Sequence, residues 1–216
     1  MSRGDRESPR YNEKLTGILQ LFLLATAATS LSAQPRNFAG MGGGFATLSG
    51  DARVEVGADG AATSLYDAKN GPLFHIFGGR HWNDYLSVQG SYTWNRNDAT
   101  ITSALAGSRP VFQQEAVQAA LHQASADLML YFRGRRDWVR PYLAGGFAVT
   151  RFTGIESTKA GIRATAGIDL VHTSGWGFRY CFLETVSGNP LGERMRPPGQ
   201  KKLMNFQNVF GFLRQW

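Results

Sequence analysis

Residues 205–216 of the chain read NFQNVFGFLRQW. In an extended strand, successive side chains point to opposite faces, so this stretch presents two different surfaces. One face carries Phe206, Phe210, Phe212 and Trp216, and the other carries Gln207, Val209, Gly211 and Gln215. Each aromatic ring left in water forfeits roughly 1.5–3 kcal/mol of burial free energy. A strand of a membrane β-barrel avoids this loss because its outer face contacts lipid while its inner face points into the lumen.

The start of the chain has the layout of a secretory signal peptide. A charged stretch at 1–17 precedes an apolar run at 18–28 and a small-residue segment at 29–33. We expect cleavage after Ala33, which leaves residues 34–216 as one outer-membrane barrel domain. The alternative is a short transmembrane anchor, but the apolar run is shorter than the roughly 20 residues that a helix needs to cross a bilayer. No second apolar run of that length follows.

Five segments alternate with period two between apolar and polar residues, the pattern of a half-buried strand. They are residues 86–95, 127–133, 162–170, 176–183 and 205–216. Three further segments, 37–48, 72–82 and 138–152, are also predicted strands, and the first and third are rich in glycine. In 138–152 the odd-numbered set Val139, Leu143, Phe147 and Val149 is the more apolar, and we expect it to face lipid.

The connections between these eight strands fall into two alternating classes. Short turns are expected at 81–84, 134–137 and 173–175, and long loops at 49–71, 97–121, 153–160 and 187–203. The Gln- and Ala-rich segment 111–122 also fits a short helix. Outer-membrane barrels have this asymmetry between short periplasmic turns and long outer loops. A soluble β-sandwich or lipocalin is the alternative, although its exterior positions would carry more Lys and Glu.

Two stretches of the chain resemble the small eight-stranded outer-membrane β-barrel superfamily, which includes the OmpA membrane domain and the opacity-type porins. They are residues 140–147 (RPYLAGGF) and 210–216 (FGFLRQW). The resemblance covers about residues 37–216 and implies an all-β fold, an eight-stranded antiparallel transmembrane up-and-down β-barrel in the Gram-negative outer membrane. It also implies that Phe206, Phe210, Gly211, Phe212 and Trp216 form the assembly signal for the barrel-insertion machinery.

The lumen of an eight-stranded barrel is just wide enough for side chains to fill. The charged residues that we place on the inward phase are Asp127, Arg133, Arg163, Asp169 and Arg179. Because an unpaired buried charge costs several kcal/mol, we expect these residues to form a polar network that plugs the lumen. The alternative is a narrow gated pore.

Composition excludes several classes of site. A net charge of +7 is compatible with nucleic-acid binding, but this chain is exported and its basic residues are scattered. We therefore expect no nucleic-acid partner, and outer-membrane lipid and lipopolysaccharide as partners instead. The single Cys181 allows neither an intramolecular disulfide nor a Cys-based zinc site. The Gly/Asp clusters at 50–51 and 58–60 lack the ligand spacing of a calcium loop. We expect no cofactor and no metal.

Aromatic and basic side chains are expected at the membrane boundaries. Trp and Tyr near strand ends fit interfacial belts, with ordinary core or turn aromatics as the alternative; the set is Trp82, Tyr85, Trp94, Trp138, Tyr142, Trp176 and Trp216. Basic residues of the last loop lie near the predicted outer headgroups, where they would attract anions; they are Arg194, Arg196, Lys201 and Lys202.

One set of residues has the types needed for nucleophilic catalysis, namely His172, Ser174 and Glu184. His172 has a lipid-facing phase and Ser174 lies in a predicted turn, so we expect no catalytic site and no enzyme. We expect a structural or surface-interaction role, with unidentified ligands at the outer loops. Because the sequence stops at Trp216, no cell-wall-binding domain is expected after the barrel. A narrow porin-like channel and a lipid-modifying outer-membrane enzyme are the alternatives.

Overall fold

The computed structural model describes residues 36–49, 54–55, 62–105, 111–195 and 198–216. The predicted signal peptide at 1–33 lies outside the described residues, as do the Gly/Asp clusters at 50–51 and 58–60 and residue Arg196. The strands described below belong to one unit, residues 35–215.

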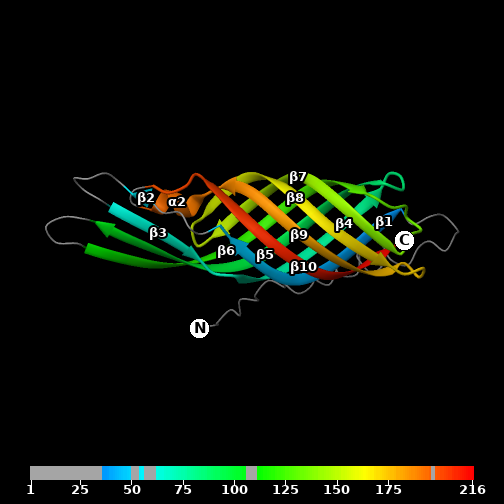
Figure 1. Ribbon diagram of the computed structural model, residues 1–216, viewed down its shortest axis with the longest axis horizontal. Coiled ribbons are helices and arrows are strands. Elements are labelled where there is room, and N and C mark those ends of the chain that lie inside the picture. The colour runs from blue at the N-terminus through cyan, green and yellow to red at the C-terminus, as the bar shows by residue number, and fades with distance from the viewer. Residues whose placement is uncertain (1–35, 50–53, 56–61, 106–110, 196–197) are drawn as a thin grey trace, which may run out of the picture. The chain divides into compact units, whose positions relative to one another are not determined.

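Eight antiparallel strands form a closed ring (Figure 1), in which each strand pairs with its neighbours along the chain and β1 pairs with β10. Their bounds are β1 (Asn37–Leu48), β4 (Gly71–His81), β5 (Leu86–Leu105), β6 (Val111–Tyr131), β7 (Val139–Thr153), β8 (Ser157–Val171), β9 (Trp176–Gly188) and β10 (Lys202–Gln215). Three smaller elements lie in the connections: β2 (Val54–Glu55), β3 (Ala62–Ala68) and helix α2 (Pro190–Arg194). The predicted eight-stranded antiparallel barrel is therefore confirmed.

Two seams close the ring. β1 pairs with β10 from Phe38↔Gln215 to Leu48↔Asn205, and β5 pairs with β6 from Leu86↔Leu130 to Leu105↔Val111. A closed ring pairs its backbone groups between strands and leaves no sheet edge exposed to hydrocarbon. In the part of the chain that the structure describes, no helix has the length and apolarity to cross a membrane.

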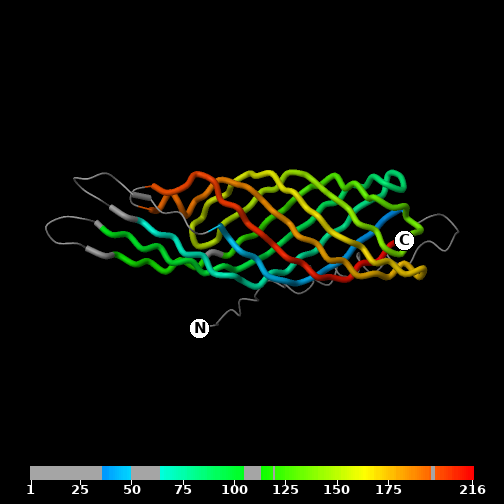
Figure 2. Tube along the Cα trace, in the orientation of Figure 1, coloured from blue at the N-terminus to red at the C-terminus, as the bar shows by residue number. Residues whose placement is uncertain are grey.

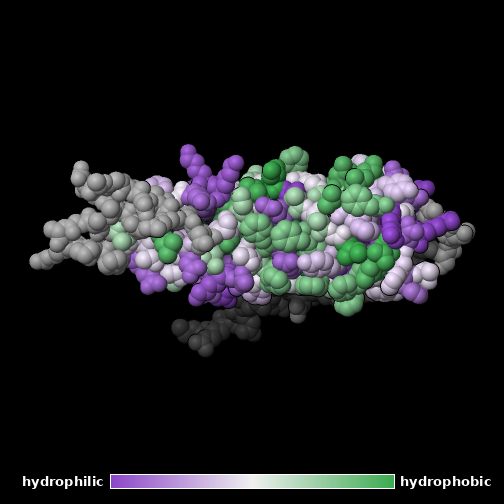
Figure 3. Space-filling model, in the orientation of Figure 1, coloured by the Kyte–Doolittle hydropathy of each residue, from purple (hydrophilic) through white to green (hydrophobic). Residues whose placement is uncertain are grey.

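The two faces of each strand differ as the period-two pattern predicts. On β7, Phe147 is 76% exposed and Leu143 is 50% exposed, whereas Ala148 and Thr150 are each 2% exposed and point inward. The predicted outward phase of the odd-numbered set in this strand is therefore confirmed. On the face that Figure 3 shows, apolar residues gather over the middle of the barrel and hydrophilic residues lie on either side of them. This distribution is that of a lipid-facing belt.

Aromatic side chains surround the end of the barrel that carries the short turns. Trp82, Trp138 and Trp176 are 55–65% exposed there, as an interfacial belt requires. Tyr142 is an exception to the sequence prediction, because it lies inside the barrel and is 2% exposed. The even-numbered positions of β7 point toward the lumen, as the buried Arg140, Ala148 and Thr150 show, and Tyr142 shares their phase.

The predicted loop at 97–121 is wrong, because β5 continues to Leu105 and β6 already begins at Val111. The two strands form a long hairpin that extends past the other strands on the side of β2 and β3 (Figures 1 and 2). β3 pairs with residues 99–105 of this extension. Beyond the lipid the outward face of β5 carries polar residues such as Asp98 and Thr102, so the apolar outward stripe that marks the other strands is missing there. The helix considered for 111–122 is also wrong, since pairing with β5 overrides helix propensity.

The predicted long loop at 153–160 is likewise wrong. β7 ends at Thr153 and β8 begins at Ser157, so three residues turn the chain. Gly154 and Glu156 have φ angles of 92° and 52°, the left-handed conformation that a tight hairpin turn requires. Polar residues at 157–159 belong to β8 beyond the lipid-facing belt.

Two glycines on the inward face of the wall make room for aromatic rings. A Cβ atom added at Gly40 would overlap the ring of Phe77, and one added at Gly79 would overlap the ring of Phe38. Both rings are buried in the lumen at 5% and 1% exposure. The glycine content of β1 and β4 thus permits a lumen that large side chains fill.

If the outward face contacts hydrocarbon, a charge placed there is costly. We expect Leu143→Arg to lower the free energy of unfolding in lipid vesicles by about 2–4 kcal/mol, whereas Gln114→Arg on the exposed extension changes it by less than about 0.5 kcal/mol. The measurement is denaturant titration of the refolded protein in vesicles. Equal, small effects of both substitutions would contradict a lipid-facing position for Leu143.

Candidate functional site

The barrel lumen brings together charged side chains from distant parts of the chain. Arg179 of β9 and Asp169 of β8 are register partners, and their side chains are 1% and 0% exposed. Arg179 Nε donates to Asp169 Oδ1 at 2.6 Å, and Arg179 Nη2 donates to Asp169 Oδ2 at 2.7 Å. This two-point geometry is the strongest form of an arginine–carboxylate pair.

The same guanidinium reaches the opposite wall. Arg179 Nη1 donates to Gln89 Oε1 at 2.5 Å, and Gln89 belongs to β5, four strands away from β9 in a ring of eight. The guanidinium carbon also lies 4.2 Å from the ring centre of Phe77 on β4. Arg179 therefore spans the lumen at this level.

Additional hydrogen bonds complete the partners of the Asp169 carboxylate. The Tyr131 hydroxyl donates to Asp169 Oδ2 at 2.9 Å, and Arg179 Nη2 lies 3.2 Å from the same hydroxyl oxygen. A buried ion pair stabilises a fold only where further hydrogen bonds compensate the loss of water. The Tyr131 contact provides such compensation.

A second charged layer lies next to the first. Arg163 of β8 has Nη2 3.3 Å from Asp127 Oδ2 of β6, with side-chain exposures of 0% and 1%. Arg163 Nη1 donates to the hydroxyls of Ser125 at 2.7 Å and Ser91 at 2.9 Å. Ser91 lies on β5, three strands from β8, so this arginine also crosses the interior.

Arg133 is the one predicted lumen residue that the structure places elsewhere. It is exposed and lies after the end of β6, which stops at Tyr131. Residue 133 would point inward if β6 continued that far. The strand ends two residues earlier, so Arg133 lies in the turn. The four other residues of the predicted set lie inside the barrel, in two pairs.

The mouth at the long-loop end has an apolar core of its own. Helix α2 lies between β9 and β10, and Leu191 and Met195 at this helix are both 0% exposed. They pack with residues from six strands in a cluster that comprises Leu48, Tyr66, Ala99, Ile101, Val117, Leu121, Phe152, Leu191, Met195 and Leu203. Burial raises the pKa of Tyr66 well above its ordinary value.

Helix α2 has a sequence signal that the strand analysis did not use. Asn189 caps the helix, and its Oδ1 accepts from the backbone N–H groups of Leu191 and Gly192, both at 3.1 Å. Pro190 occupies the first turn, where its missing N–H carries no penalty. Asn-Pro inside a predicted loop therefore marks the start of a short helix.

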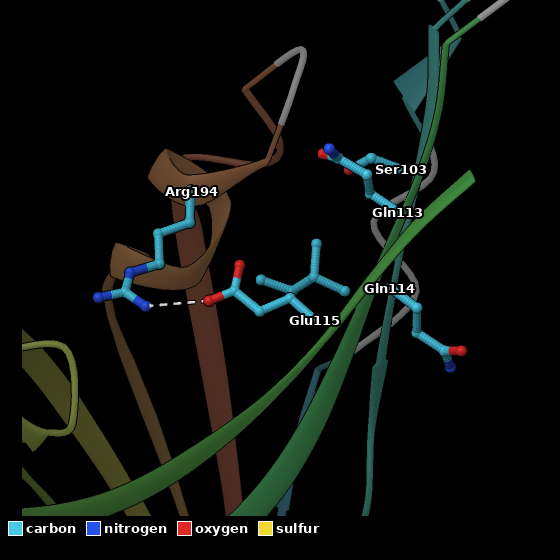
Figure 4. Close-up of a pocket in the computed structure, with 6 residues that line it drawn as sticks. Ser103, Gln113, Gln114, Glu115 and Arg194 are labelled. Carbon is cyan, nitrogen blue, oxygen red and sulfur yellow. Dashed lines mark hydrogen bonds and ion pairs between the residues drawn. The ribbon is translucent and has the colours of Figure 1, made fainter. Parts of the chain in front are cut away.

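A cavity of about 350 Å³ lies between α2 and the β5–β6 extension (Figure 4). Arg194 of α2 points toward Glu115 of β6, and Arg194 Nη1 lies 3.5 Å from Glu115 Oε1. Ser103, Gln113 and Gln114 complete the polar part of its lining. Because both ionic groups are largely exposed, this ion pair contributes at most about 1 kcal/mol.

The residues considered for nucleophilic catalysis are not assembled. His172 Nδ1 lies 3.0 Å from Ser174 Oγ, but both residues are exposed in the β8–β9 turn. Glu184 of β9 pairs in register with Ala164 of β8. It lies eight residues beyond Trp176, about 26 Å along the strand from that turn. Among the described residues, no group of three or more His, Cys, Asp or Glu side chains is arranged to hold a metal ion.

The residues predicted as an assembly signal lie on β10, except for Trp216, which lies outside the unit 35–215. Phe210 and Phe212 point outward at 47% and 69% exposure, and Phe206 is half-buried and stacks with Phe182. Gly211 points inward against β1, where an added Cβ would lie 2.6 Å from the Met41 carbonyl oxygen.

Comparisons with known proteins agree with this architecture. Residues 19–207 match the family model described as outer membrane protein beta-barrel domain. Neisserial surface protein A is similar in structure, with a TM-score of 0.55 and 16% identity over 83% of this chain and 97% of that one. OprG from Pseudomonas aeruginosa aligns at 11% identity and a TM-score of 0.46, over 87% of this chain and 99% of that one. No curated protein sequence matches the chain.

The Asp169–Arg179 pair permits a double-mutant cycle. We expect Asp169→Leu or Arg179→Met alone to cost about 3–5 kcal/mol, since each leaves a buried charge without its partner. The double variant is expected to lose less than the sum of the two, by about 0.5–3 kcal/mol. Denaturant unfolding in vesicles measures all four proteins, and strictly additive losses would show that the two charges are not coupled.

Proposed function

Because this chain belongs to the outer membrane protein beta-barrel domain family, we propose that it is a sealed outer-membrane barrel whose role is carried by its extracellular segments. The protein resides in the bacterial outer membrane, in an environment of lipid and lipopolysaccharide. In such barrels the short turns face the periplasm and the long loops face the outside. The β5–β6 extension, β3 and α2 are then extracellular.

Two independent barriers support a sealed lumen. Arg179 of β9 hydrogen-bonds to Asp169 of β8 and to Gln89 of β5 across the interior. Arg163 of β8 reaches β5 and β6 through hydrogen bonds to Ser91 and Ser125 and an ion pair with Asp127. Above them, Leu191 and Met195 of the last loop are completely buried in the apolar core of the extracellular mouth. A conducting pathway would have to pass both the charged layers and this apolar core.

The extracellular extension is the observation that carries the proposed surface role. β5 and β6 contain 20 and 21 residues, although a tilted strand crosses the membrane in about 9–11. About ten residues of each strand therefore extend outward, roughly 33 Å at the usual rise per residue. β6 pairs with β7 only from Ala120 onward, so in the described structure residues 111–119 present a sheet edge with no strand beside it. Such an edge can bind an extended segment of a partner.

Basic side chains on the outer wall of the barrel fit the lipopolysaccharide phosphates. His122 and Arg151 are register partners on β6 and β7, and Arg96 on β5 pairs with Ala120, the next outward position. Side chains at such positions lie roughly 5–8 Å apart, within reach of one anionic group. The Tyr92 hydroxyl holds His122 through a 2.6 Å contact with Nδ1.

The β10 segment with Phe206, Phe210, Gly211, Phe212 and Trp216 is proposed to contact the insertion machinery during assembly.

Planar-bilayer recording tests the sealed lumen. We expect the refolded protein to give no discrete conductance steps, because the two arginines and the α2 core occupy the pathway. The heat-modifiability of the same sample on a gel shows that the barrel is folded. Regular steps whose frequency rises with the amount of folded protein would contradict the proposal and favour the narrow porin-like channel.

We also propose that the protein is not an enzyme. His172 and Ser174 provide the test, as they form the one histidine–hydroxyl pair considered for catalysis and lie far from Glu184. Cells producing the wild-type chain or the variant His172→Ala with Ser174→Ala are expected to have identical lipid A and phospholipid profiles by mass spectrometry. A lipid product that appears with the wild type and disappears with the variant would show that the chain processes lipid.

A further inference from the structure

The periplasmic mouth contains a second cavity, of about 560 Å³. Its walls come from the β6–β7 turn and the β8–β9 turn, together with the end of β10. Its lining includes Arg135, Arg136, Trp138, Val171, His172 and Gln215. Val171 and Gln215 belong to the inward face of their strands, so the cavity lies below the floor of the lumen.

The cavity is basic. None of the described residues that line it is acidic, and it has two arginines and one histidine. Asp84 pairs with Arg135 at 2.8 Å, and Asp137 accepts a hydrogen bond from the Gly134 backbone N–H at 2.9 Å. Within the described part of the chain, Arg136 has no ion-pair partner, so its charge is available to a ligand.

Two buried residues at the same end of the barrel have side-chain donors without hydrogen-bond partners. Gln215 is 4% exposed and lines the cavity, and its Nε2 has no hydrogen-bond partner among the described residues. Arg140 is 0% exposed, and none of its three guanidinium nitrogens has one either. Arg140 is the register partner of Asp169, which precedes Val171 by two residues on the same inward face. It therefore lies one layer above the cavity floor.

The hydrogen-bond donors and the positive charge of these groups determine which class of ligand fits the cavity. A buried donor without an acceptor is destabilising, and more so when it is charged, so a bound acceptor stabilises this end of the barrel. Gln215 Nε2 and the arginine nitrogens are all donors, which an oxyanion satisfies. Guanidinium groups bind phosphate oxygens with two parallel hydrogen bonds.

The depth of the cavity points to the source of that oxyanion. Trp138 lines the cavity and is 63% exposed, and exposed Trp at a strand end marks the headgroup zone of a bilayer. Trp138 and Val171 also give the cavity an apolar wall. We infer that the periplasmic mouth binds the phosphate of an anionic phospholipid headgroup from the inner leaflet, through Arg136 and Gln215, with Arg140 as a deeper donor.

Binding is tested with the refolded full chain in a neutral detergent. The probes are dihexanoyl phosphatidylglycerol, dihexanoyl phosphatidylcholine and inorganic phosphate, each titrated by calorimetry. We expect saturable binding of the phosphatidylglycerol, and binding of the phosphatidylcholine and of inorganic phosphate that is weaker by about tenfold or more. If inorganic phosphate binds as tightly as the phosphatidylglycerol, the lipid source is wrong, and if the phosphatidylcholine does, the anionic specificity is wrong.

Two arginines of the same turn provide a matched pair of variants. Arg136→Gln removes a charge that lines the cavity, whereas Arg133→Gln removes an exposed charge that does not. We expect Arg136→Gln to weaken phosphatidylglycerol binding by about tenfold, the value of one charge-assisted hydrogen bond, and Arg133→Gln to leave it unchanged. Both residues are exposed, so both variants should fold, which gel heat-modifiability checks. Equal affinity of the Arg136→Gln variant and the wild type, or equal losses in both variants, would overturn the site.

Discussion

The closure of the ring is the constraint on which the rest of the structure depends. In hydrocarbon a backbone N–H or C=O without a partner costs several kcal/mol, so the wall must satisfy all of its own hydrogen bonds. The β1–β10 seam does this by pairing strands from the two ends of the barrel unit. Once the ring is closed, every side chain is assigned to lipid or to lumen by its phase. The placement of Phe147 outside and Arg163 inside follows from that assignment.

The narrow lumen then fixes the chemistry of the interior. Arg163 and Arg179 point inward and cannot reach bulk water, so they take carboxylates, amides and hydroxyls of other strands as partners. These contacts connect strands across the interior as well as around the ring. At the extracellular mouth the requirement is different, because α2 buries Leu191 and Met195 in an apolar core. The two ends of the barrel therefore differ in character: one is capped by an apolar core, and the other has a basic cavity near the unpaired donors of Gln215 and Arg140.

The sequence allowed prediction of the part of the fold that lies in lipid. Period-two alternation located five of the eight barrel strands, because lipid and lumen impose opposite polarity on the two faces. The three less regular segments were also correctly predicted as strands, and the odd-numbered apolar set indicated the phase of β7. The same signal fails where lipid ends. It missed the outer halves of β5 and β6, and it extended the inward phase to Arg133 in a turn. It placed Asp127, Arg163, Asp169 and Arg179 in the lumen, but the cap formed by Leu191 and Met195 requires long-range contacts that no local pattern specifies.

The central claim is that the apolar face of each strand contacts hydrocarbon and the other face lines a filled interior. Nitroxide scanning of β7 tests it most directly, with one cysteine at a time at 142–150 and the buried Cys181 replaced by Ser. In vesicles, collision with oxygen, which concentrates in hydrocarbon, should be high at Leu143, Phe147 and Val149 and low at Tyr142, Ala148 and Thr150. Oxygen accessibility that lacks this period of two, or that peaks at the even-numbered positions, would contradict the account.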